Sequence, residues 1–328
     1  MKKISHGGNI YKKAKEMGIQ EEDILDFSAN ISPLGLPEHI RRAMIEAIDG
    51  TINYPDPDCS RLKEAISKQD NVPESHITCG NGGADLLYRL AFGLHPKKVL
   101  LPAPAFVEYE EALSAAGAQM EYYLMRDDFV IKEDILEQIT EETDFVVICN
   151  PNNPTGVVYS EETIKELAAI LEKKQQEFGS VIYLISDEPY RELAYDGVEV
   201  PYLTKYYKNT VVGYSYSKSL SLPGERIGYL VIPDELEDSA TVITAAAIAN
   251  RVLGSVNAPS LMQKVIQKCV DAEVDVAAYD RNRLALYNGL KECGFECIKP
   301  QGAFYLFVKS PVADEKQFCE AGKKYNIL

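Results

Sequence analysis

Short continuous runs of apolar residues alternate with segments of helical periodicity over most of the chain. The runs that we interpret as strands cover residues 97–102, 145–149, 181–186 and 210–212. Helices are predicted between them at residues 106–116 and 161–178, and Ser160 is a suitable N-cap for the second. Continuous apolar strands that alternate with helices are typical of a mostly parallel sheet covered on both faces. The pattern therefore predicts an α/β fold whose large domain has three layers, α/β/α.

The pattern changes after about residue 233. Residues 245–253 and 274–293 have helical periodicity, and the apolar residues 302–308 are predicted to form a strand. We interpret this part of the chain as a second, smaller α+β domain. The predicted division is an N-terminal arm at residues 1–38, a large domain at residues 39–235 and a small domain at residues 236–328.

Three polar residues each come just after a predicted strand. They are Asn150, Asp187 and Lys218. Ligands of parallel sheets bind beyond the carboxyl ends of the strands, so these three side chains are expected to converge on one crevice.

The amino-acid composition and the net charge argue against several classes of protein. The 328 residues are 46% hydrophobic and 26% charged, which is typical of a globular chain. The net charge is −16 and Lys and Arg form no basic stripe, which argues against a nucleic-acid partner. The seven scattered cysteines and four distant histidines form no metal-binding set, and we expect free thiols in a reducing compartment. The N-terminus has no apolar signal segment and no run of about 18 apolar residues occurs, so we predict a soluble, cytoplasmic protein without membrane contact.

Lys218 is the strongest candidate for chemistry. It is flanked by Ser215, Ser217 and Ser219 and is followed eight residues later by Arg226. An amine in this position can form a Schiff base with an aldehyde cofactor, while hydroxyls and a guanidinium hold the cofactor's phosphate. The alternative is an ordinary exposed lysine in a serine-rich loop.

A glycine-rich turn at residues 78–85 leads into a predicted helix. Free N–H groups at a helix N-terminus bind phosphate, and the alternative is a plain turn. The spacing does not match a dinucleotide-binding or P-loop motif, which argues against a nucleotide-binding protein.

Three further segments supply candidates that suit a planar cofactor. Phe106, just past a strand end, could stack on a ring or could belong to the core. The turn at residues 150–156 has three amides, of which one could bind a phenolate oxygen. Asp187 ends a buried strand and suits a protonated ring nitrogen, although it could also cap a turn. Tyr190 could reach the ring oxygen.

Taken together, these motifs resemble the fold-type I pyridoxal-phosphate enzymes of the class I/II aminotransferase group. The segments that carry the resemblance, in family order, are GNGGAD (80–85), PAF (104–106), NPNNPTG (150–156), SDEPY (186–190) and SYSKSLSLPGERIGY (215–229). The resemblance implies a large cofactor-binding domain with a mostly parallel sheet and a smaller α+β domain. It also implies an N-terminal arm that packs on the small domain and the site entrance.

The resemblance assigns roles to individual residues. It implies that Lys218 forms the internal aldimine with pyridoxal 5′-phosphate and that Asp187 pairs with the pyridine nitrogen. It implies that Asn153 and Tyr190 contact the ring oxygen and that Phe106 stacks on the ring. The implied phosphate ligands are backbone groups of Asn81 and Gly82 and the side chains of Ser215, Ser217 and Arg226.

The family builds its sites at a dimer interface. Tyr54, in the segment at residues 53–57, resembles the tyrosine that reaches the phosphate of the neighbouring subunit. A homodimer acting on a small-molecule amino substrate is therefore implied.

Two features point to different branches of the family. Residues 6–9 and 26–35 resemble the threonine-phosphate decarboxylase relatives of histidinol-phosphate aminotransferase, which makes Asn30 a candidate substrate contact. The segment from Asp187 to Leu193 resembles general aminotransferases instead. We predict an aminotransferase acting on an amino acid or a phosphorylated amino compound and a 2-oxo acid. The alternatives are a threonine-phosphate decarboxylase of cobalamin biosynthesis and a catalytically incomplete cofactor-binding protein.

The second of these alternatives, a catalytically incomplete protein, rests on the C-terminus. The chain ends at residues 324–328, where a small-domain strand is expected to begin, and the small domain is interpreted as truncated. In family members the following stretch carries an arginine that binds the substrate carboxylate. Arg251, Arg281 and Arg283 lie in helical contexts and are not obvious replacements.

Overall fold

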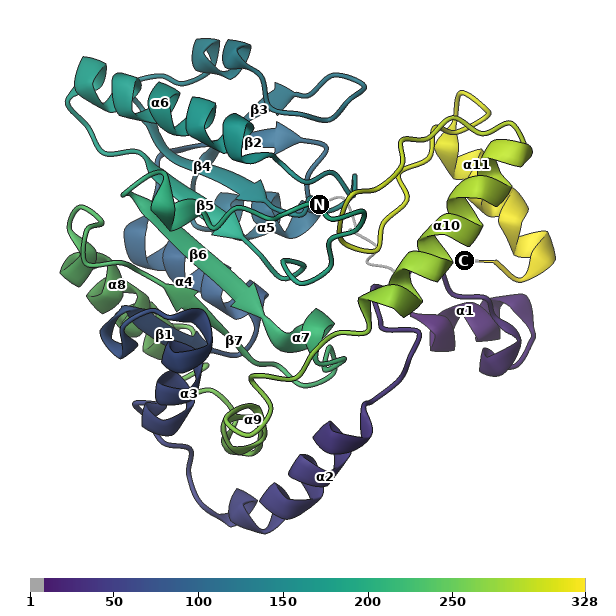
Figure 1. The fold of residues 1–328 in the computed structure, drawn as a ribbon, viewed down its shortest axis with the longest axis horizontal. Coiled ribbons are helices and arrows are strands. Elements are labelled where there is room, and N and C mark those ends of the chain that lie inside the picture. Colours follow the sequence, from purple (N-terminus) through teal and green to yellow (C-terminus); the bar gives the residue numbers. More distant parts are fainter. Residues whose placement is uncertain (1–8, 328) are drawn as a thin grey trace.

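The centre of the molecule is a seven-stranded sheet, seen in a computed structural model that describes residues 9–327 (Figure 1). The strand order is β1-β7-β6-β5-β4-β2-β3, in which β7 is antiparallel to both neighbours and the remaining pairs are parallel. The strands are β1 Ile77–Gly80, β2 Lys98–Ala103, β3 Gln119–Leu124, β4 Thr143–Cys149, β5 Tyr183–Asp187, β6 Thr210–Ser215 and β7 Gly228–Val231. The four strands predicted from apolar runs are confirmed.

Helices cover both faces of this sheet and extend the chain at its two ends (Figure 1). The α-helices are α1 Ile10–Met17, α2 Glu38–Ala47, α3 Ser60–Asp70, α4 Gly83–Leu94, α5 Val107–Ala115, α6 Glu161–Phe178, α7 Tyr216–Ser219, α8 Ser239–Val252, α9 Ser260–Ile266, α10 Val276–Glu292 and α11 Glu315–Gly322. Short 3₁₀ turns are η1 Glu21–Asp23, η2 Ile48–Ile52, η3 Glu74–His76, η4 Glu133–Glu137, η5 Leu203–Lys205 and η6 Lys323–Tyr325. As predicted, the Ser160 side chain caps α6 and accepts a hydrogen bond from the Thr163 N–H at 3.2 Å.

The core divides between the two faces of the sheet. In β4, Val147 enters an apolar cluster with residues of α4, α5 and α8, whereas its neighbour Val146 enters a cluster with residues of α6. Side chains that alternate along a strand point to opposite faces, so burial of both requires a layer of helices on each side. The predicted three-layer α/β architecture is confirmed.

Helices α8 and α9 pack with the sheet rather than with the segment that follows them. Val242 of α8 lies in the same cluster as α4, and Met262 and Ile266 of α9 pack with Ile40 of α2 in a third apolar cluster. The division into domains stays a prediction, and this packing favours a boundary after α9 over one at residue 235.

The predicted strand at residues 302–308 is wrong. Only single bridges occur there, between Gly302 and Ala194 and between Val308 and Cys297. Phe304 and Tyr305 pack against Tyr190 in the loop after β5, and Phe307 packs against Phe129, so the apolar run reflects contacts with other elements and not a strand ladder. The helices predicted at 245–253 and 274–293 are confirmed as the C-terminal part of α8 and as α10.

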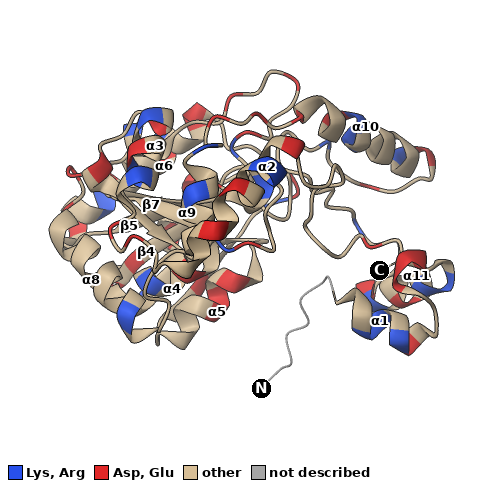
Figure 2. Cartoon of the chain, turned by 90° about the horizontal axis from the view of Figure 1, so that it is seen from below, with Lys and Arg blue, Asp and Glu red and all other residues tan. Residues whose placement is uncertain are grey.

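The N-terminal segment lies against the C-terminal one, and α1 is beside α11 in both views (Figures 1 and 2). Leu25 forms a parallel bridge with Ile327, and its N–H donates to the Asn326 carbonyl at 2.8 Å. The motif at residues 6–9 falls outside the described residues except for Asn9, whose side chain caps α1.

Acidic and basic residues are interspersed on the helices (Figure 2). In α3 the Lys68 ammonium lies 2.6 Å from Glu64, and in α6 Lys165 lies 2.7 Å from Glu161. Pairs of this kind on the surface contribute little to stability, so the fold depends mainly on its apolar clusters.

Candidate active site

A cavity of about 320 Å³ lies at the carboxyl ends of the central strands. Its walls come from the ends of β5 and β6, from α4, α5 and α7 and from the N-terminal segment. The predicted site residues that line it are Asn30, Phe106, Asn153, Asp187, Tyr190, Ser215, Ser217, Lys218 and Arg226. Parallel strands bring these residues together because β4, β5 and β6 end at the same edge of the sheet.

Lys218 lies in α7, a helix of four residues that directly follows β6. Its Nζ donates to the Asn30 carbonyl oxygen at 2.7 Å and lies 5.5 Å from the centre of the Phe304 ring. Burial lowers the pKa of Lys218 to about 8, and the nearby Arg226 guanidinium lowers it further while Asp187 opposes the shift. A buried amine with a lowered pKa is more often unprotonated, which is the form that acts as a nucleophile or base.

Asp187 ends β5 and is the principal acid of the cavity. Burial raises the pKa of this carboxyl group to about 6, and a hydrogen bond from the Tyr109 hydroxyl to Asp187 Oδ2, at 2.6 Å, limits the rise. Tyr109 is a site residue that the sequence motifs do not predict. The sequence spacing could have predicted Tyr109 as a site residue, because it lies three residues after Phe106 and therefore on the same face of the predicted helix.

A cradle for an anion lies beside Lys218. Arg226 Nη1 donates to Ser217 Oγ at 3.3 Å, and Ser217 Oγ lies 2.9 Å from Ser215 Oγ. Gly82 precedes α4 with φ of +86°, and a Cβ there would lie 2.7 Å from Arg226 Nη2. Only glycine fits this approach without strain. The start of the twelve-residue helix α4 thus meets a guanidinium and two hydroxyls, which is a donor set suited to phosphate.

Asn81 is not brought to this cradle. Its backbone N–H donates to Asp85 Oδ2 at 2.8 Å and its side chain donates to the Asn257 carbonyl at 3.1 Å. Gly83 and Ala84 line the cavity in its place. The backbone N–H of Asn81, which was predicted to bind the phosphate, is therefore already used by Asp85.

The amides at residues 150–156 divide between turn and cavity. Asn150 accepts from the Tyr159 N–H at 2.9 Å, and Asn152 accepts from Thr155 Oγ1 at 2.7 Å. Asn153 lines the cavity. Two amides stabilise the turn, which leaves the third, the predicted one, to face a ligand.

Aromatic residues from the C-terminal part of the chain complete the site. The Tyr190 hydroxyl forms a hydrogen bond with the hydroxyl of Tyr305, and the Tyr190 ring packs edge-on against Phe304 with centroids 5.4 Å apart. Both of these C-terminal residues lie in the segment predicted to be a strand, and their contact with the site was not predicted.

Other candidates lie away from the cavity. Tyr54 is 98% exposed and lines a separate groove with Asp56 and Arg61. Arg283 is buried and paired with Asp196 at 2.9 Å, so its charge is already compensated.

Two other features, a metal site and a membrane-spanning helix, are absent from the described residues. Among residues 9–327, no group of three or more His, Cys, Asp or Glu side chains is arranged to hold a metal ion. No helix in the same range is both long and apolar enough to cross a membrane.

Comparison with known proteins places this geometry in a family. The family model for class I and II aminotransferases matches residues 22–327. The chain is 35% identical over 234 residues to threonine-phosphate decarboxylase of Salmonella typhimurium, an alignment that covers 70% of this chain but only 62% of that protein. It is 31% identical over 332 residues to histidinol-phosphate aminotransferase of Methanocella arvoryzae, covering 100% of this chain and 87% of that one.

A crystal structure of an aminotransferase from Eubacterium rectale has the same fold. It superposes with a TM-score of 0.87 at 41% identity, over 97% of this chain and 84% of that chain. The agreement of fold and sequence over nearly the whole described chain confirms the resemblance seen in the motifs. The chain belongs to the family of class I and II aminotransferases.

Proposed function

We propose that this protein is a pyridoxal-phosphate-dependent aminotransferase that acts on a phosphorylated amino compound or an amino acid. The observation that carries the proposal is the arrangement of Lys218, Asp187 and the Arg226 cradle around a single cavity. Each group suits a different part of the cofactor, and the family to which the chain belongs uses that cofactor.

The residues present fit pyridoxal phosphate. The hydroxyls of Ser215 and Ser217, the Arg226 guanidinium and the start of α4 would hold the phosphate. Asp187 has the neutral Tyr109 hydroxyl as a hydrogen-bond partner and no ion pair among residues 9–327, so a protonated ring nitrogen would complete its largely desolvated environment. When bound, the cofactor supplies an electron sink next to the substrate's Cα.

The chain's own residues then move protons and exclude water. Lys218, with its lowered pKa, can accept a proton at Nζ and return it to an adjacent carbon. The rings of Tyr190 and Phe304 lie near the amine and Phe106 lines the same cavity, and together they restrict access of water. We assign Asn153 and Tyr190 to the ring oxygen, following the family pattern.

Decarboxylation is the second candidate, and the 35% identity to threonine-phosphate decarboxylase favours it. Asn30 also supports that branch, since it brings the N-terminal segment into the cavity wall next to Lys218. Both reactions would need the same proton carrier at Lys218. They differ in which bond at Cα is held for cleavage.

The proposal includes a homodimer. Tyr54 is almost fully exposed, and the neighbouring Ile52 is 88% exposed. An exposed tyrosine next to apolar residues fits a role in reaching the phosphate cradle of a second copy, as the resemblance implies.

The first experiment tests attachment of the cofactor. The purified protein is incubated with pyridoxal phosphate, reduced with borohydride and digested, and mass spectrometry locates the modified lysine. We expect modification at Lys218 and none there in Lys218→Ala. Lys208→Ala is the matched control, because Lys208 is exposed and lies before β6 instead of after it. Modification that persists unchanged at another lysine in Lys218→Ala would contradict the assignment.

The second experiment identifies the reaction. The loaded protein is mixed separately with threonine phosphate, histidinol phosphate and aspartate, and keto product and carbon dioxide are measured. Keto product with conversion of the cofactor to its amine form supports aminotransfer. Carbon dioxide released from threonine phosphate supports the decarboxylase. A loaded protein that changes none of these amines, nor other amino acids, would overturn both and leave a binding protein.

A further inference from the structure

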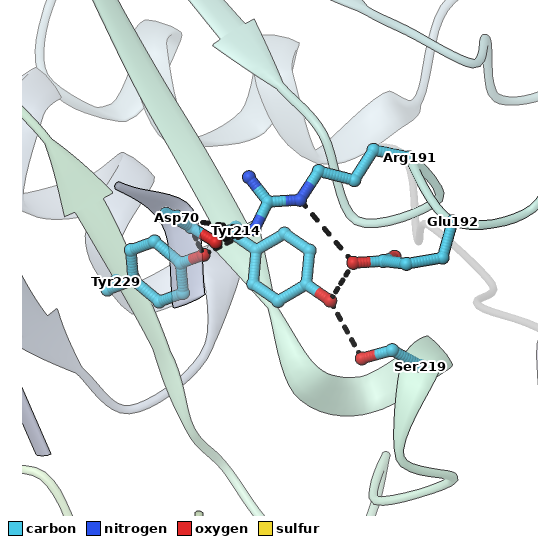
Figure 3. Close-up of polar contacts among 6 residues, drawn as sticks. All are labelled: Asp70, Arg191, Glu192, Tyr214, Ser219 and Tyr229. Atoms are coloured by element: carbon cyan, nitrogen blue, oxygen red, sulfur yellow. Dashed lines mark hydrogen bonds and ion pairs between the residues drawn. The ribbon is translucent and has the colours of Figure 1, made fainter. Parts of the chain in front are cut away.

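Six side chains form a polar network beneath the loop that follows β5 (Figure 3). They come from five separate parts of the chain, and together we call them the Arg191 network. Its members are Asp70, Arg191, Glu192, Tyr214, Ser219 and Tyr229. None of them belongs to the cavity wall, so the proposed chemistry does not use them directly.

One end of the network fixes Arg191. Its Nη2 donates to both oxygens of Asp70 at 2.9 Å and to the Tyr229 hydroxyl at 2.6 Å. The Tyr229 hydroxyl also donates to Asp70. The Arg191 side chain is 18% exposed and that of Asp70 is 8% exposed, so the pair is largely protected from water. Protected charge pairs with several hydrogen bonds hold their geometry much better than exposed ones.

The middle of the network holds Glu192. Arg191 Nε lies 3.4 Å from Glu192 Oε1, and the Tyr214 hydroxyl donates to the same oxygen at 2.6 Å. The Arg191 guanidinium also lies over the Tyr214 ring, 4.1 Å from its centre. Tyr214 is thus held at its ring and at its hydroxyl by two adjacent residues of one loop.

The far end of the network reaches α7. The Tyr214 hydroxyl forms a second hydrogen bond, 2.8 Å long, with Ser219 Oγ. Ser219 is the last residue of α7 and the direct neighbour of Lys218. The loop that holds Arg191 and Glu192 directly follows Asp187, the last residue of β5, and contains Tyr190. The network therefore connects the two segments that carry the principal acid and the amine of the site.

Helix α7 needs such support. A helix of four residues has very little stability of its own, so neighbouring elements determine where its side chains point. At its start, Ser215 caps the helix by accepting from the Ser217 N–H at 3.3 Å. At its end, the bond from Tyr214 to Ser219 is the corresponding side-chain restraint.

We propose that Tyr214, held by Glu192 and Arg191, is a positioning residue that sets the place of the Lys218 amine relative to Asp187. The proposal deepens the function assigned above and rests on it. Tyr214 touches neither the amine nor the cavity, and it acts through Ser219. Without its hydroxyl, α7 loses the restraint at its end and the Lys218 amine becomes free to move toward solvent.

The test compares Tyr214→Phe with Tyr207→Phe in the cofactor-free protein. Tyr207 is the matched control, because it is also buried and its hydroxyl also makes a hydrogen bond, to the Ile182 carbonyl at 2.6 Å, but remote from α7. The readout is the pH dependence of Lys218 acetylation by trace acetic anhydride, followed by mass spectrometry. Asp187 and Arg226 are the charged groups that face the amine, and both stay unchanged in the two variants.

We expect the wild-type midpoint to lie near pH 8. In Tyr214→Phe it should move upward, toward the value of about 10.4 for a free lysine, because the amine leaves its buried place. In Tyr207→Phe it should stay where it is. With the reacting amine as substrate, kcat should fall about 10-fold in Tyr214→Phe, with KM changed less than 2-fold, since a misplaced group costs rate more than binding.

Ser219→Ala removes the other partner of the same bond and should reproduce both effects. Glu192→Gln keeps an acceptor for Tyr214 and should show a smaller change, which also tests the idea if Tyr214→Phe unfolds. An unmoved midpoint in Tyr214→Phe and Ser219→Ala would overturn the proposal. Because the labelling needs neither cofactor nor turnover, it decides this point even if the proposed function fails on its own tests.

Discussion

The carboxyl edge of the sheet and the region from α10 to the C-terminus contribute to the same site in different ways. At the sheet edge, Asp187 ends a buried strand, and Val146 and Leu184, which pair three residues earlier in β4 and β5, have no exposed surface. In the C-terminal region, α11 has no buried residue and Tyr325 is 74% exposed. Few buried apolar contacts mean a low cost of local opening. The site thus places its acid, amine and phosphate cradle at the sheet edge. The C-terminal region adds aromatic cover through Phe304 and Tyr305, which pack against the large apolar cluster, whereas α11 beyond them is weakly packed.

The largest expected effect is the loss of activity on substitution of Asp187 at the carboxyl edge of the sheet. Asp187→Asn should lower kcat about 1000-fold, because an amide cannot balance a positive ring nitrogen in a buried site. Activity with the reacting amine measures this, and circular dichroism checks that the fold is kept. A loss of less than about 10-fold would show that Asp187 does not act on the cofactor.

The second largest expected effect is a difference in unfolding free energy between substitutions in the two regions. Phe145→Ala in β4 should lower the free energy of unfolding by about 3–5 kcal/mol, because its ring is 1% exposed and truncation leaves a cavity in the core. Phe318→Ala in α11 should cost less than about 1 kcal/mol, since its ring is 42% exposed. Denaturant titration measures both. Equal losses of unfolding free energy in the two variants would contradict the conclusion that α11 is packed more weakly than the sheet.

The pH dependence of cofactor attachment tests the electrostatics of the site at the sheet edge. Only the unprotonated amine reacts, so below the Lys218 pKa of about 8 the rate should rise about 10-fold per pH unit and then level off. Asp187 favours the protonated amine, so Asp187→Asn should move the midpoint to lower pH. Stopped-flow absorbance at several pH values gives the profile. A midpoint near 10.4 would mean that the amine is exposed in solution.

The smallest expected effect concerns the aromatic cover from the C-terminal region. Tyr305→Phe removes the hydroxyl that bonds Tyr190 but keeps the ring. One hydrogen bond between neutral groups is worth about 1 kcal/mol, so kcat/KM should fall about 5-fold. A matched control is Tyr287→Phe on the partly exposed surface of α10. A fall as large as that of Asp187→Asn would make the C-terminal region part of the chemistry.

Much of the architecture follows from local pattern. Strands β2, β4, β5 and β6 are continuous apolar runs, and their burial on both faces explains why the pattern found them. Strand β3 lies at an edge of the sheet and mixes exposed and polar positions, so no apolar run predicts it. The segment at 302–308 shows the opposite error, because its apolar residues cover the site and find no strand partner among the described residues.

The features of the candidate site likewise divide into those that the sequence determined and those that only the tertiary structure decided. By itself, the sequence determined which residues stand just past the strand ends and which motifs follow one another, because chain order and strand length set these features locally. Tertiary structure decided that Tyr109 supports Asp187, that Asp85 accepts from the Asn81 N–H, and that Tyr214 connects the loop after β5 to α7. These contacts depend on how strands far apart in the chain lie side by side. Side-chain hydrogen bonds need a match of a few tenths of an ångström, which periodicity along the chain does not encode.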